Sequence, residues 1–334
     1  MRPVFAIVGC GRIARRHAEQ IKRVGTLAAV CDIDNTAADE LSRAFGARPY
    51  YSIESLLASE PGLDVVSICT PNGLHAHHSI LALKAGCHVL CEKPLSISVS
   101  DAREMIEAAQ QSGKMLFVVK QNRFNPPVQV VKQWLTDGTL GRIHSFQVNG
   151  FWNRPREYYL QSWKGTRDLD GGTLFTQFSH FVDLLYWFLG EVKSVRSFIR
   201  NFEHPFIDIE DTGVAILEMT NGAIGTLNYT VNSFQKNMEG SITLFGEKGT
   251  VKIGGQYLNT LEYQNLQSGA GKPIPEGNPA NQYGFYQGSM SNHDKVYENL
   301  VMALQQPGYE LASAQDGLKT VEIICQIYGQ AGFH

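Results

Sequence analysis

The sequence predicts a two-domain α/β protein. An N-terminal domain with a doubly wound parallel sheet, residues 1–121, precedes a C-terminal α/β domain with a large, mostly antiparallel sheet, residues 122–334. Up to residue 121, apolar runs without polar alternation take turns with amphipathic stretches, which is typical of parallel strands covered by helices. Beyond that point the apolar runs alternate with polar residues and are separated by turn signals, as in antiparallel sheets.

The first domain is predicted from strand-like runs and the helix-like stretches between them. Strands are expected at 4–9, 27–33, 65–70, 88–94 and 115–121, and helices at 12–25, 35–46, 75–86 and 98–113. Gly25 should end the first helix. The second helix should begin at a cap formed by Asn35 and end at Gly46.

The second domain is predicted to contain an antiparallel sheet interrupted by one helix. Strand-like segments cover 142–152, 192–202, 213–231 and 240–255, and helices are expected at 126–138, 176–190 and 313–331. Asn221-Gly222 is a strong hairpin signal, and Lys248-Gly249 marks a second turn. The Gly-, Pro- and Asn-rich stretch 265–284 should be a long surface excursion.

Composition argues against several classes of partner. The net charge is −3, so we expect no nucleic-acid partner. No apolar run approaches the roughly 18 residues of a membrane span, and the N-terminus lacks the pattern of a signal peptide. We therefore expect a soluble, cytoplasmic protein with no membrane partner. The six cysteines form no CxxC pair, so free thiols are expected ahead of disulfides or zinc.

The first strand leads into a dinucleotide-binding fingerprint. Gly9, Gly11 and Ala14 have the spacing G-x-G-x-x-A between a strand and a helix, and Asp32 ends the second strand. This context predicts a Rossmann domain in which the carboxylate binds a ribose diol. The same carboxylate would repel a 2′-phosphate, so the expected cofactor is NAD. The cofactor-binding residues expected here are Gly9, Gly11, Arg12, Ile13 and Asp32.

Lys93 lies directly before Pro94, at the carboxyl end of a predicted central strand. Open α/β sheets bind their ligands at that edge. Proline restricts the residue before it to extended conformations, so the lysine side chain has a defined direction. A partly desolvated lysine can take part in acid–base chemistry. The alternative is a structural ion pair of Lys93 with Glu92 or Asp101.

Three stretches together resemble the Gfo/Idh/MocA family of NAD(P)-dependent oxidoreductases. They are "VGCGRIARRHAEQI", "DVVSICTPNGLHAHHSILALKAGCHVLCEKPLS" and "DGGTLFTQFSHFVDLLYW". The resemblance implies that Lys93 is the active-site lysine and that Pro94 follows a cis bond. It also implies further cofactor contacts at Thr70, Pro71, Asn72, His75, Glu92, Lys93, Gln121 and Trp163. No metal is expected, because His75, His77 and His78 would lie on different faces of a helix.

The second-domain motif departs from the family pattern G-G-G-x-L-x-D-x-G-x-H-x-x-D, in which the first Asp and the His form a catalytic pair. His180 and Asp183 are retained, but Thr176 replaces that Asp and Phe178 replaces the later glycine. On one α-helix Thr176 and His180 would share a face. Since a hydroxyl cannot stabilise an imidazolium as a carboxylate does, His180 alone or with Lys93 would have to handle the proton. The alternative for His180 is a structural core histidine.

Residues 151–181 resemble the bacterial UDP-N-acetylglucosaminuronate 3-dehydrogenases (WlbA/WbpB type) within this family. The resemblance implies NAD-dependent oxidation of the sugar 3-hydroxyl, in the biosynthesis of surface polysaccharide. Basic and aromatic residues crowd this stretch and suit an anionic nucleotide sugar. The expected substrate-binding residues are Lys93, Arg154, Tyr159, Lys164, Arg167, Thr176, Gln177 and His180, with Lys93 and His180 catalytic. Arg156, Tyr158 and Trp163 are expected to line the same entrance to the substrate site, which we call the mouth. The residues expected near the nucleotide are Ser291, Asn292, His293 and Lys295.

Two other functions fit the sequence. One is a dehydrogenase of a free polyol or monosaccharide such as an inositol, and the other is a non-catalytic sensor that binds NAD and a sugar. The resemblance also implies a homodimer or homotetramer paired through the open faces of the second-domain sheets.

Overall fold

The computed structural model describes residues 2–160, 162–269, 274–275, 277–282, 287–306, 309 and 312–333. The chain forms two compact units. Met1–Val119 and His293–Val321 make up the first, and Lys120–Asn292 and Glu322–His334 make up the second. The sequence prediction assigned every residue after 121 to the second domain. In the structure, His293–Val321 belongs to the first unit.

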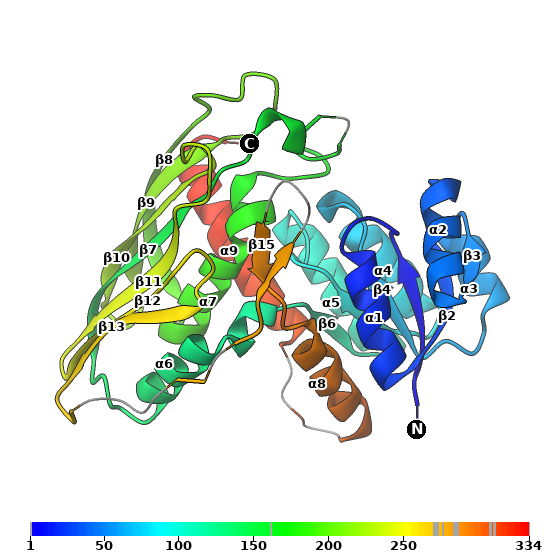
Figure 1. Cartoon of the computed structure of the whole chain (residues 1–334), viewed down its shortest axis with the longest axis horizontal. Helices are drawn as coiled ribbons and strands as arrows, with labels where there is room; N and C mark the ends of the chain where they lie inside the picture. The colour runs from blue at the N-terminus through cyan, green and yellow to red at the C-terminus, as the bar shows by residue number, and fades with distance from the viewer. Residues whose placement is uncertain are drawn as a thin grey trace. The chain divides into compact units, whose positions relative to one another are not determined.

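A six-stranded parallel sheet forms the first unit (Figure 1). Its strands are β1 (Val4–Val8), β2 (Thr26–Cys31), β3 (Arg48–Tyr50), β4 (Val65–Ile68), β5 (His88–Cys91) and β6 (Leu116–Val118). They are ordered β3-β2-β1-β4-β5-β6. The chain adds β2 and β3 on one side of β1 and then adds β4, β5 and β6 on the other, so the point where the strand order reverses lies between β1 and β4. This doubly wound arrangement confirms the predicted fold class. It places a ligand-binding crevice at the carboxyl ends of the central strands.

The helices of the first unit connect these strands. They are α1 (Ala14–Val24), α2 (Asn35–Phe45), α3 (Ile53–Ser59), the 3₁₀ turn η1 (Asn72–Leu74), α4 (His75–Lys84) and α5 (Val99–Ser112). Gly46 ends α2 in the left-handed conformation, as predicted. The predicted Asn35 cap is wrong, because Asp34 accepts hydrogen bonds from the amides of Thr36 and Ala37. The sequence prediction missed β3 and α3, which are only 3 and 7 residues long.

Helix α8 (His293–Gln305) belongs to the first unit although it lies near the end of the chain. Tyr297 on this helix is fully buried, and its hydroxyl lies 2.8 Å from Ser67 Oγ and 2.8 Å from His17 Nδ1. Its ring also meets Phe5 edge-on at 5.8 Å. These buried contacts explain why the segment packs on the parallel sheet, which no local pattern in the sequence indicates.

A seven-stranded sheet dominates the second unit. Its strands are β7 (Ile143–Phe151), β8 (Val192–Arg200), β9 (Thr212–Met219), β10 (Ile224–Thr230), β11 (Glu239–Gly246), β12 (Gly249–Gly254) and β13 (Thr260–Leu266). The order is β13-β12-β11-β7-β10-β9-β8, and β7–β10 is the parallel pair in a sheet otherwise antiparallel. The hairpin at Asn221-Gly222 joins β9 to β10 as predicted, and the second predicted turn joins β11 to β12. Part of the predicted excursion 265–284 lies outside the described residues; Ala280–Gln282 (β14) pairs with Gln287–Met290 (β15).

One face of the seven-stranded sheet is covered by helices (Figure 1). These are α6 (Pro126–Thr136), α7 (Ser179–Leu189) and the second-unit part of α9 (Ala314–Gln330). The strands alternate buried and exposed residues, so the opposite face carries exposed apolar side chains. Phe198 is 73% exposed, Ile216 59% and Val214 45%. The shorter turns η2 (Gln121–Phe124), η3 (Arg156–Tyr158) and η4 (Leu174–Phe178) complete the unit.

Two expectations about the whole chain can be compared with the structure. All six cysteines are free thiols; four are buried, and Cys10 and Cys325 are half-buried. Among the described residues no helix combines the length and the apolar character needed to span a bilayer.

Candidate active site

The glycine turn after β1 has the geometry that the dinucleotide fingerprint requires. Gly9 has φ +95°, and an added Cβ would lie 2.6 Å from the main chain of Cys69 and Thr70. A side chain at Gly11 would meet no atom within 4 Å. Gly9 is therefore required by close packing against the end of β4, whereas Gly11 leaves open space. That space is what the fingerprint reserves for a pyrophosphate.

Asp32 lies at the end of β2 and is held by this turn. Its Oδ2 accepts a hydrogen bond from the Cys10 amide at 2.6 Å, and its Oδ1 accepts one from the Asp34 amide at 2.9 Å. Helix α1 begins just after the turn, with Ile13 at its cap and no acidic side chain in its first turn. The positive end of the helix dipole is therefore not neutralised by its own sequence. These groups fit a dinucleotide.

The Lys93-Pro94 peptide bond is cis, which confirms the expectation from the resemblance. Lys93 is half-buried. Both ring nitrogens of the buried His75 face carbonyl oxygens on either side: Nδ1 lies 2.6 Å from Pro94 O and Nε2 lies 2.9 Å from Thr70 O. His75 thus links the lysine turn to the end of β4. Its predicted contact with the cofactor stays a prediction, as do those of Thr70, Pro71, Asn72, Arg12 and Ile13.

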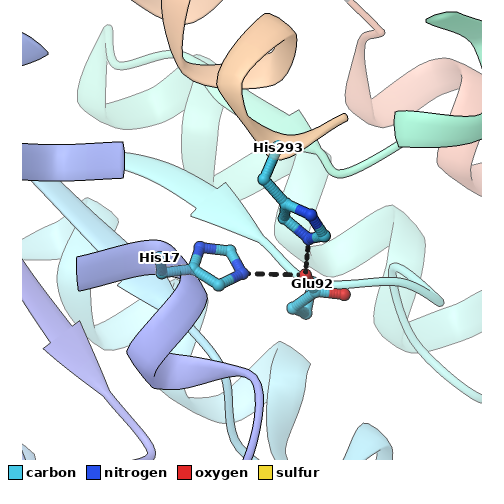
Figure 2. Close-up of side chains that lie close together, drawn as sticks. All are labelled: His17, Glu92 and His293. Atoms are coloured by element: carbon cyan, nitrogen blue, oxygen red, sulfur yellow. Dashed lines mark hydrogen bonds and ion pairs between the residues drawn. The ribbon is translucent and has the colours of Figure 1, made fainter. Parts of the chain in front are cut away.

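Glu92 forms a buried cluster with two histidines from distant parts of the chain (Figure 2). Its Oε1 lies 2.8 Å from His17 Nε2 on α1 and 3.4 Å from His293 Nε2 on α8. Its Oε2 accepts a hydrogen bond from the Lys93 amide at 3.0 Å. Burial alone would raise the pKa of Glu92, but the hydrogen bonds and charges of the two imidazoles outweigh it and hold that pKa well below its ordinary value. An ionised carboxylate is therefore built into the turn that carries Lys93.

The residue types of this cluster could also ligate a metal ion. Its geometry is that of a hydrogen-bond network. The 2.8 Å separation of His17 Nε2 and Glu92 Oε1 is a normal hydrogen-bond length, whereas two ligands about 2.0–2.1 Å from a tetrahedral zinc lie farther apart. The network continues through His17 Nδ1 to the Tyr297 hydroxyl at 2.8 Å. We therefore interpret the cluster as a support for the Lys93 turn.

In the second unit, His180 lies near the start of α7 and is 3% exposed. The Gln121 amide Nε2 donates to His180 Nε2 at 3.1 Å, which orients the ring and, in this amide orientation, leaves the proton of a neutral ring on Nδ1. Gln121 was expected to contact the cofactor, and that role stays a prediction.

Asp183, one turn after His180, anchors the same helix. It pairs with Arg123 through two hydrogen bonds of 2.9 and 2.8 Å, and Lys120 Nζ lies 3.0 Å away. All three side chains are buried or nearly so. Burial alone would raise the pKa of Asp183, but the two cations lower it to about 2. The two contacts of α7, at His180 and at Asp183, fix the histidine against the segment Lys120–Arg123.

The expected α-helix is wrong at its start, because Leu174–Phe178 is a π-helix, in which residue i pairs with i+5. The predicted contact between Thr176 and His180 stays a prediction. The Thr176 hydroxyl donates to the carboxylate of Asp170. Phe178, which replaces a glycine of the family pattern, packs where Gly150 of β7 makes room: a Cβ there would lie 2.4 Å from its ring.

Two of the predicted basic residues gather at Tyr158. Arg154 is only 2% exposed, with its guanidinium 5.4 Å from the Tyr158 ring and 5.0 Å from the Trp152 ring. Lys164 Nζ lies 5.0 Å from Tyr158 and 4.7 Å from Trp163, so its ammonium contacts two aromatic faces. In the single chain Arg154 is therefore a buried guanidinium held by aromatic rings, and its substrate contact stays a prediction.

Gln177 completes this group. Its Oε1 accepts from Arg154 Nε at 2.8 Å, and its Nε2 donates to the Tyr158 hydroxyl at 2.7 Å. Gln177 immediately follows Thr176, so the basic and aromatic group is tied directly to the π-helix.

The other predicted mouth residues lie on different aromatic rings. Arg156 stacks on Phe206 at 5.1 Å, and the exposed Arg167 stacks on Phe333 at 4.8 Å. Tyr159 is buried, with His204 5.2 Å away. Arg154 and Lys164 therefore meet at Tyr158, whereas Arg156 and Arg167 lie over other rings. A common role of the four cations in substrate binding stays a prediction.

The segment expected near the nucleotide is divided between the units. Asn292 donates to Asn125 Oδ1 at 2.7 Å and to Gln121 O at 3.3 Å, within the second unit. His293 belongs to the Glu92 cluster, and the exposed Lys295 pairs with Glu298 at 2.9 Å.

Sequence reasoning assigned no role to several residues of these networks: His17, Lys120, Arg123, Asp170 and Tyr297. His17 had no assigned role, since a histidine in an amphipathic helix carries no signal by itself. Asp170 had one available signal: it occupies the first glycine position of the family pattern, directly before Gly171-Gly172.

Comparisons with known proteins agree with this architecture. Residues 4–120 match the oxidoreductase family with an NAD-binding Rossmann fold, and residues 128–252 match the GFO/IDH/MocA C-terminal domain. The WlbA dehydrogenase from Bordetella pertussis, in complex with NADH and UDP-GlcNAcA, is similar at 35% identity and TM-score 0.89, over 99% of this chain and 97% of that one. The WlbA dehydrogenase from Chromobacterium violaceum, with the same two ligands, is also similar at 35% identity and TM-score 0.88, over 99% and 94%.

A curated relative extends the comparison. D-glucoside 3-dehydrogenase of Escherichia coli K12 is 26% identical, over 98% of this chain and 94% of its own length. The family domains, the glycine turn with its carboxylate, and the lysine before a cis proline all agree. The chain therefore belongs to the Gfo/Idh/MocA family and is an NAD-dependent oxidoreductase of the kind that includes sugar dehydrogenases.

Proposed function

We propose that the chain oxidises the 3-hydroxyl of UDP-N-acetylglucosaminuronate to the 3-keto sugar. The observation that carries this proposal is the near full-length similarity to the two WlbA dehydrogenases, whose crystal structures contain NADH and UDP-GlcNAcA. Lys93 and His180, the two residues to which the chemistry is assigned, are both present and both held by buried partners.

The chemistry requires one proton and one hydride to leave the same carbinol. The nicotinamide, when bound, accepts the hydride from C3. We assign His180 as the base, and the 3-hydroxyl would take the place of the Gln121 amide as the donor to Nε2, the nitrogen that accepts the proton. The Lys93 ammonium hydrogen-bonds the same substrate oxygen and stabilises the developing alkoxide. The Glu92 and His75 contacts hold the lysine turn, so the ammonium needs little reorganisation as charge develops.

Recognition of an anionic nucleotide sugar is assigned to the group around Tyr158. Lys164 is half-buried between two aromatic rings, where its charge is less screened than on an open surface. Such a cation suits a uronate carboxylate or a pyrophosphate. Arg154 bonds Gln177 and thereby supports the residue beside Thr176. Trp163, Tyr159 and Arg167 stay predicted ligand contacts.

A second candidate is a dehydrogenase of a free sugar or polyol. The curated D-glucoside 3-dehydrogenase, which matches nearly the whole chain, favours it. The threonine at position 176, where the family pattern has an aspartate, counts against it. A non-catalytic sensor would bind both ligands without turnover.

Formation of NADH, followed by absorbance, separates these candidates. Purified protein with NAD is given UDP-N-acetylglucosaminuronate, UDP-N-acetylglucosamine, a D-glucoside or myo-inositol. Turnover is expected with the uronate, and little with UDP-N-acetylglucosamine, whose hexose lacks the carboxylate. Turnover only with a free sugar would support the second candidate, and binding without turnover would support the sensor.

The chemistry of the product indicates the biosynthetic step that would follow. A 3-keto sugar is the substrate that a transaminase converts to a 3-amino sugar, so we propose a role in surface polysaccharide (lipopolysaccharide) biosynthesis. We also propose that a second copy covers the exposed sheet face around Phe198, Val214 and Ile216, giving a dimer or tetramer. Light scattering on wild type and Ile216→Lys tests the assembly; an unchanged mass for the variant would contradict it.

A further inference from the structure

Asp170 is a buried carboxylate that no step described so far uses. It is 1% exposed, and its two oxygens meet different donors. The Thr176 hydroxyl donates to Oδ1, and the Gly165 amide donates to Oδ2 at 2.8 Å. The Gly172 amide also hydrogen-bonds this carboxylate, and the charge of Lys164 acts on it. Thr176 is half-buried, so it is more exposed to solvent than the carboxylate to which its hydroxyl donates.

The charge of this aspartate lowers the stability of the fold near neutral pH. Burial raises its pKa to about 6, against the opposing effects of Thr176, Gly165 and the nearby Lys164. A buried group whose pKa is raised in this way makes the fold less stable at neutral pH than in acid. An asparagine of similar shape would avoid that cost. The retained carboxylate therefore points to a role in function.

The sequence position of Asp170 supports the same conclusion. In the family pattern the motif begins with a glycine and has its aspartate six positions later; in this chain Asp170 and Thr176 occupy those two positions. The carboxylate thus lies six positions earlier than in the family pattern, and Thr176, at the pattern's aspartate position, hydrogen-bonds to it. The pair restores a carboxylate to the motif, now acting through a hydroxyl.

A hydroxyl has one proton to donate and two lone pairs that accept. When an ionised carboxylate takes the proton, the oxygen can only accept from other groups. We propose that Asp170 is a positioning residue that makes Thr176 Oγ1 a fixed hydrogen-bond acceptor for a substrate hydroxyl or amide N–H. This inference rests on the proposed function in assigning Thr176 to the substrate site. Protonation of Asp170 would reverse the bond, and Thr176 would then donate to the ligand and lose the match.

A double-mutant cycle tests the pair in activity. The variants are Asp170→Asn, Thr176→Val and the double variant, measured with whichever substrate the wild type turns over. Each single change should lower kcat/KM about tenfold or more, and the double variant should be no worse than the poorer single variant. Additive losses would overturn the proposal, because they would show that the two residues act independently.

The pH profile provides a readout that a purely structural role would not change. Two groups should contribute to the acid limb of kcat/KM in the wild type: the base His180, and Asp170 with a midpoint near 6. Asp170→Asn should lose the second contribution and keep the first. Lys164 and Tyr159 are the other titratable groups that interact electrostatically with Asp170. Lys164→Met is the matched control: it should shift the midpoint of the Asp170 contribution to the pH profile without removing that contribution. A limb that persists unchanged in Asp170→Asn would contradict the assignment.

A titration without substrate separates this inference from the proposed function. Carbon-13 NMR of labelled aspartate carboxyls follows Asp170 directly, with Asp170→Asn identifying the signal. The pKa should rise in Thr176→Val, which removes a donor to the ionised form, and should stay at the wild-type value in Thr176→Ser. An unshifted signal in Thr176→Val would overturn the pair. A shifted signal in a protein that oxidises only a free sugar would overturn the proposed substrate and leave the pair in place.

Discussion

The two units hold their buried carboxylates in contrasting ways. In the first unit, the imidazoles of His17 and His293 hold Glu92 ionised beneath the Lys93 turn. In the second, burial raises the pKa of Asp170 to about 6, against the hydrogen bonds from the Thr176 hydroxyl and main-chain amides and the charge of Lys164. The partners, more than the degree of burial, decide whether a carboxylate is a fixed charge or one that titrates near neutrality.

Asp183 extends this comparison within the second unit, because it is as buried as Asp170 but has cationic partners. It is thus a fixed charge like Glu92. The two units therefore use charged clusters to anchor the elements that carry Lys93 and His180. Asp170 accepts from a hydroxyl and from main-chain amides, and we propose that its protonation alters the contacts of Thr176 with the ligand.

The largest effect is expected from breaking the Asp183 cluster. Asp183→Asn should lower the free energy of unfolding by about 3–5 kcal/mol, because Arg123 and Lys120 would be left buried without their counter-charge. Glu218→Gln is the matched control. It breaks an exposed pair with Lys193 and should cost far less, because water screens both charges. Urea unfolding measures both, and similar losses would break the distinction between buried and exposed clusters.

The next effect concerns the two proposed catalytic residues, one in each unit. Lys93→Ala and His180→Asn should each lower kcat by at least about a hundredfold, because each removes a group assigned to proton transfer or alkoxide stabilisation. Binding of NADH, followed by its fluorescence, should be retained in both. Wild-type turnover in either variant would remove that residue from the chemistry.

The pH dependence of stability should have opposite signs at Asp183 and Asp170. The pKa of Asp183 is lowered in the folded state, so its stabilising contribution is present at neutral pH and is lost as the pH falls toward about 2. The pKa of Asp170 is raised from 3.8 to about 6, so its contribution is lost as the pH rises between these values.

Asp170→Asn removes the second of these effects. Relative to wild type, its free energy of unfolding should increase by roughly 2–3 kcal/mol as the pH rises from about 4 to about 7. Urea unfolding at several pH values measures this difference. A difference that is constant with pH would show that the charge of Asp170 is fixed, like that of Glu92.

The smallest expected effect compares two glycines of one turn. Gly9→Ala should destabilise the protein by about 1–3 kcal/mol, because its Cβ would meet main-chain atoms and its φ is positive. Gly11→Ala has no such contact and should weaken NAD binding with little change in thermal stability. Equal loss of stability in both variants would contradict the different roles assigned to them.

Much of the first unit could be predicted from the sequence because its constraints are local. The glycine turn, the carboxylate ending β2 and the lysine before proline each follow from a few adjacent residues and the strand beside them. The partners of Glu92 could not be predicted in this way. They lie 75 and 201 positions away in the sequence, and only the tertiary fold brings them together.

The second unit was harder to predict, for two physical reasons. An α-helical repeat was assumed through Thr176, whereas the π-helix shifts the directions of the side chains after it. Arg154 is expected from the sequence at the accessible entrance of the substrate site, because charged side chains are mostly exposed. Aromatic rings and the amide of Gln177 instead make a buried guanidinium acceptable.

The central claim is that hydride leaves C3 of a nucleotide-sugar uronate. The most direct test uses UDP-N-acetylglucosaminuronate carrying deuterium at C3, with mass spectrometry of the reduced cofactor. Our account predicts one deuterium in the NADH, a primary isotope effect on single-turnover reduction, and a 3-keto sugar product. NADH without deuterium, or reduction only with a free sugar, would contradict it.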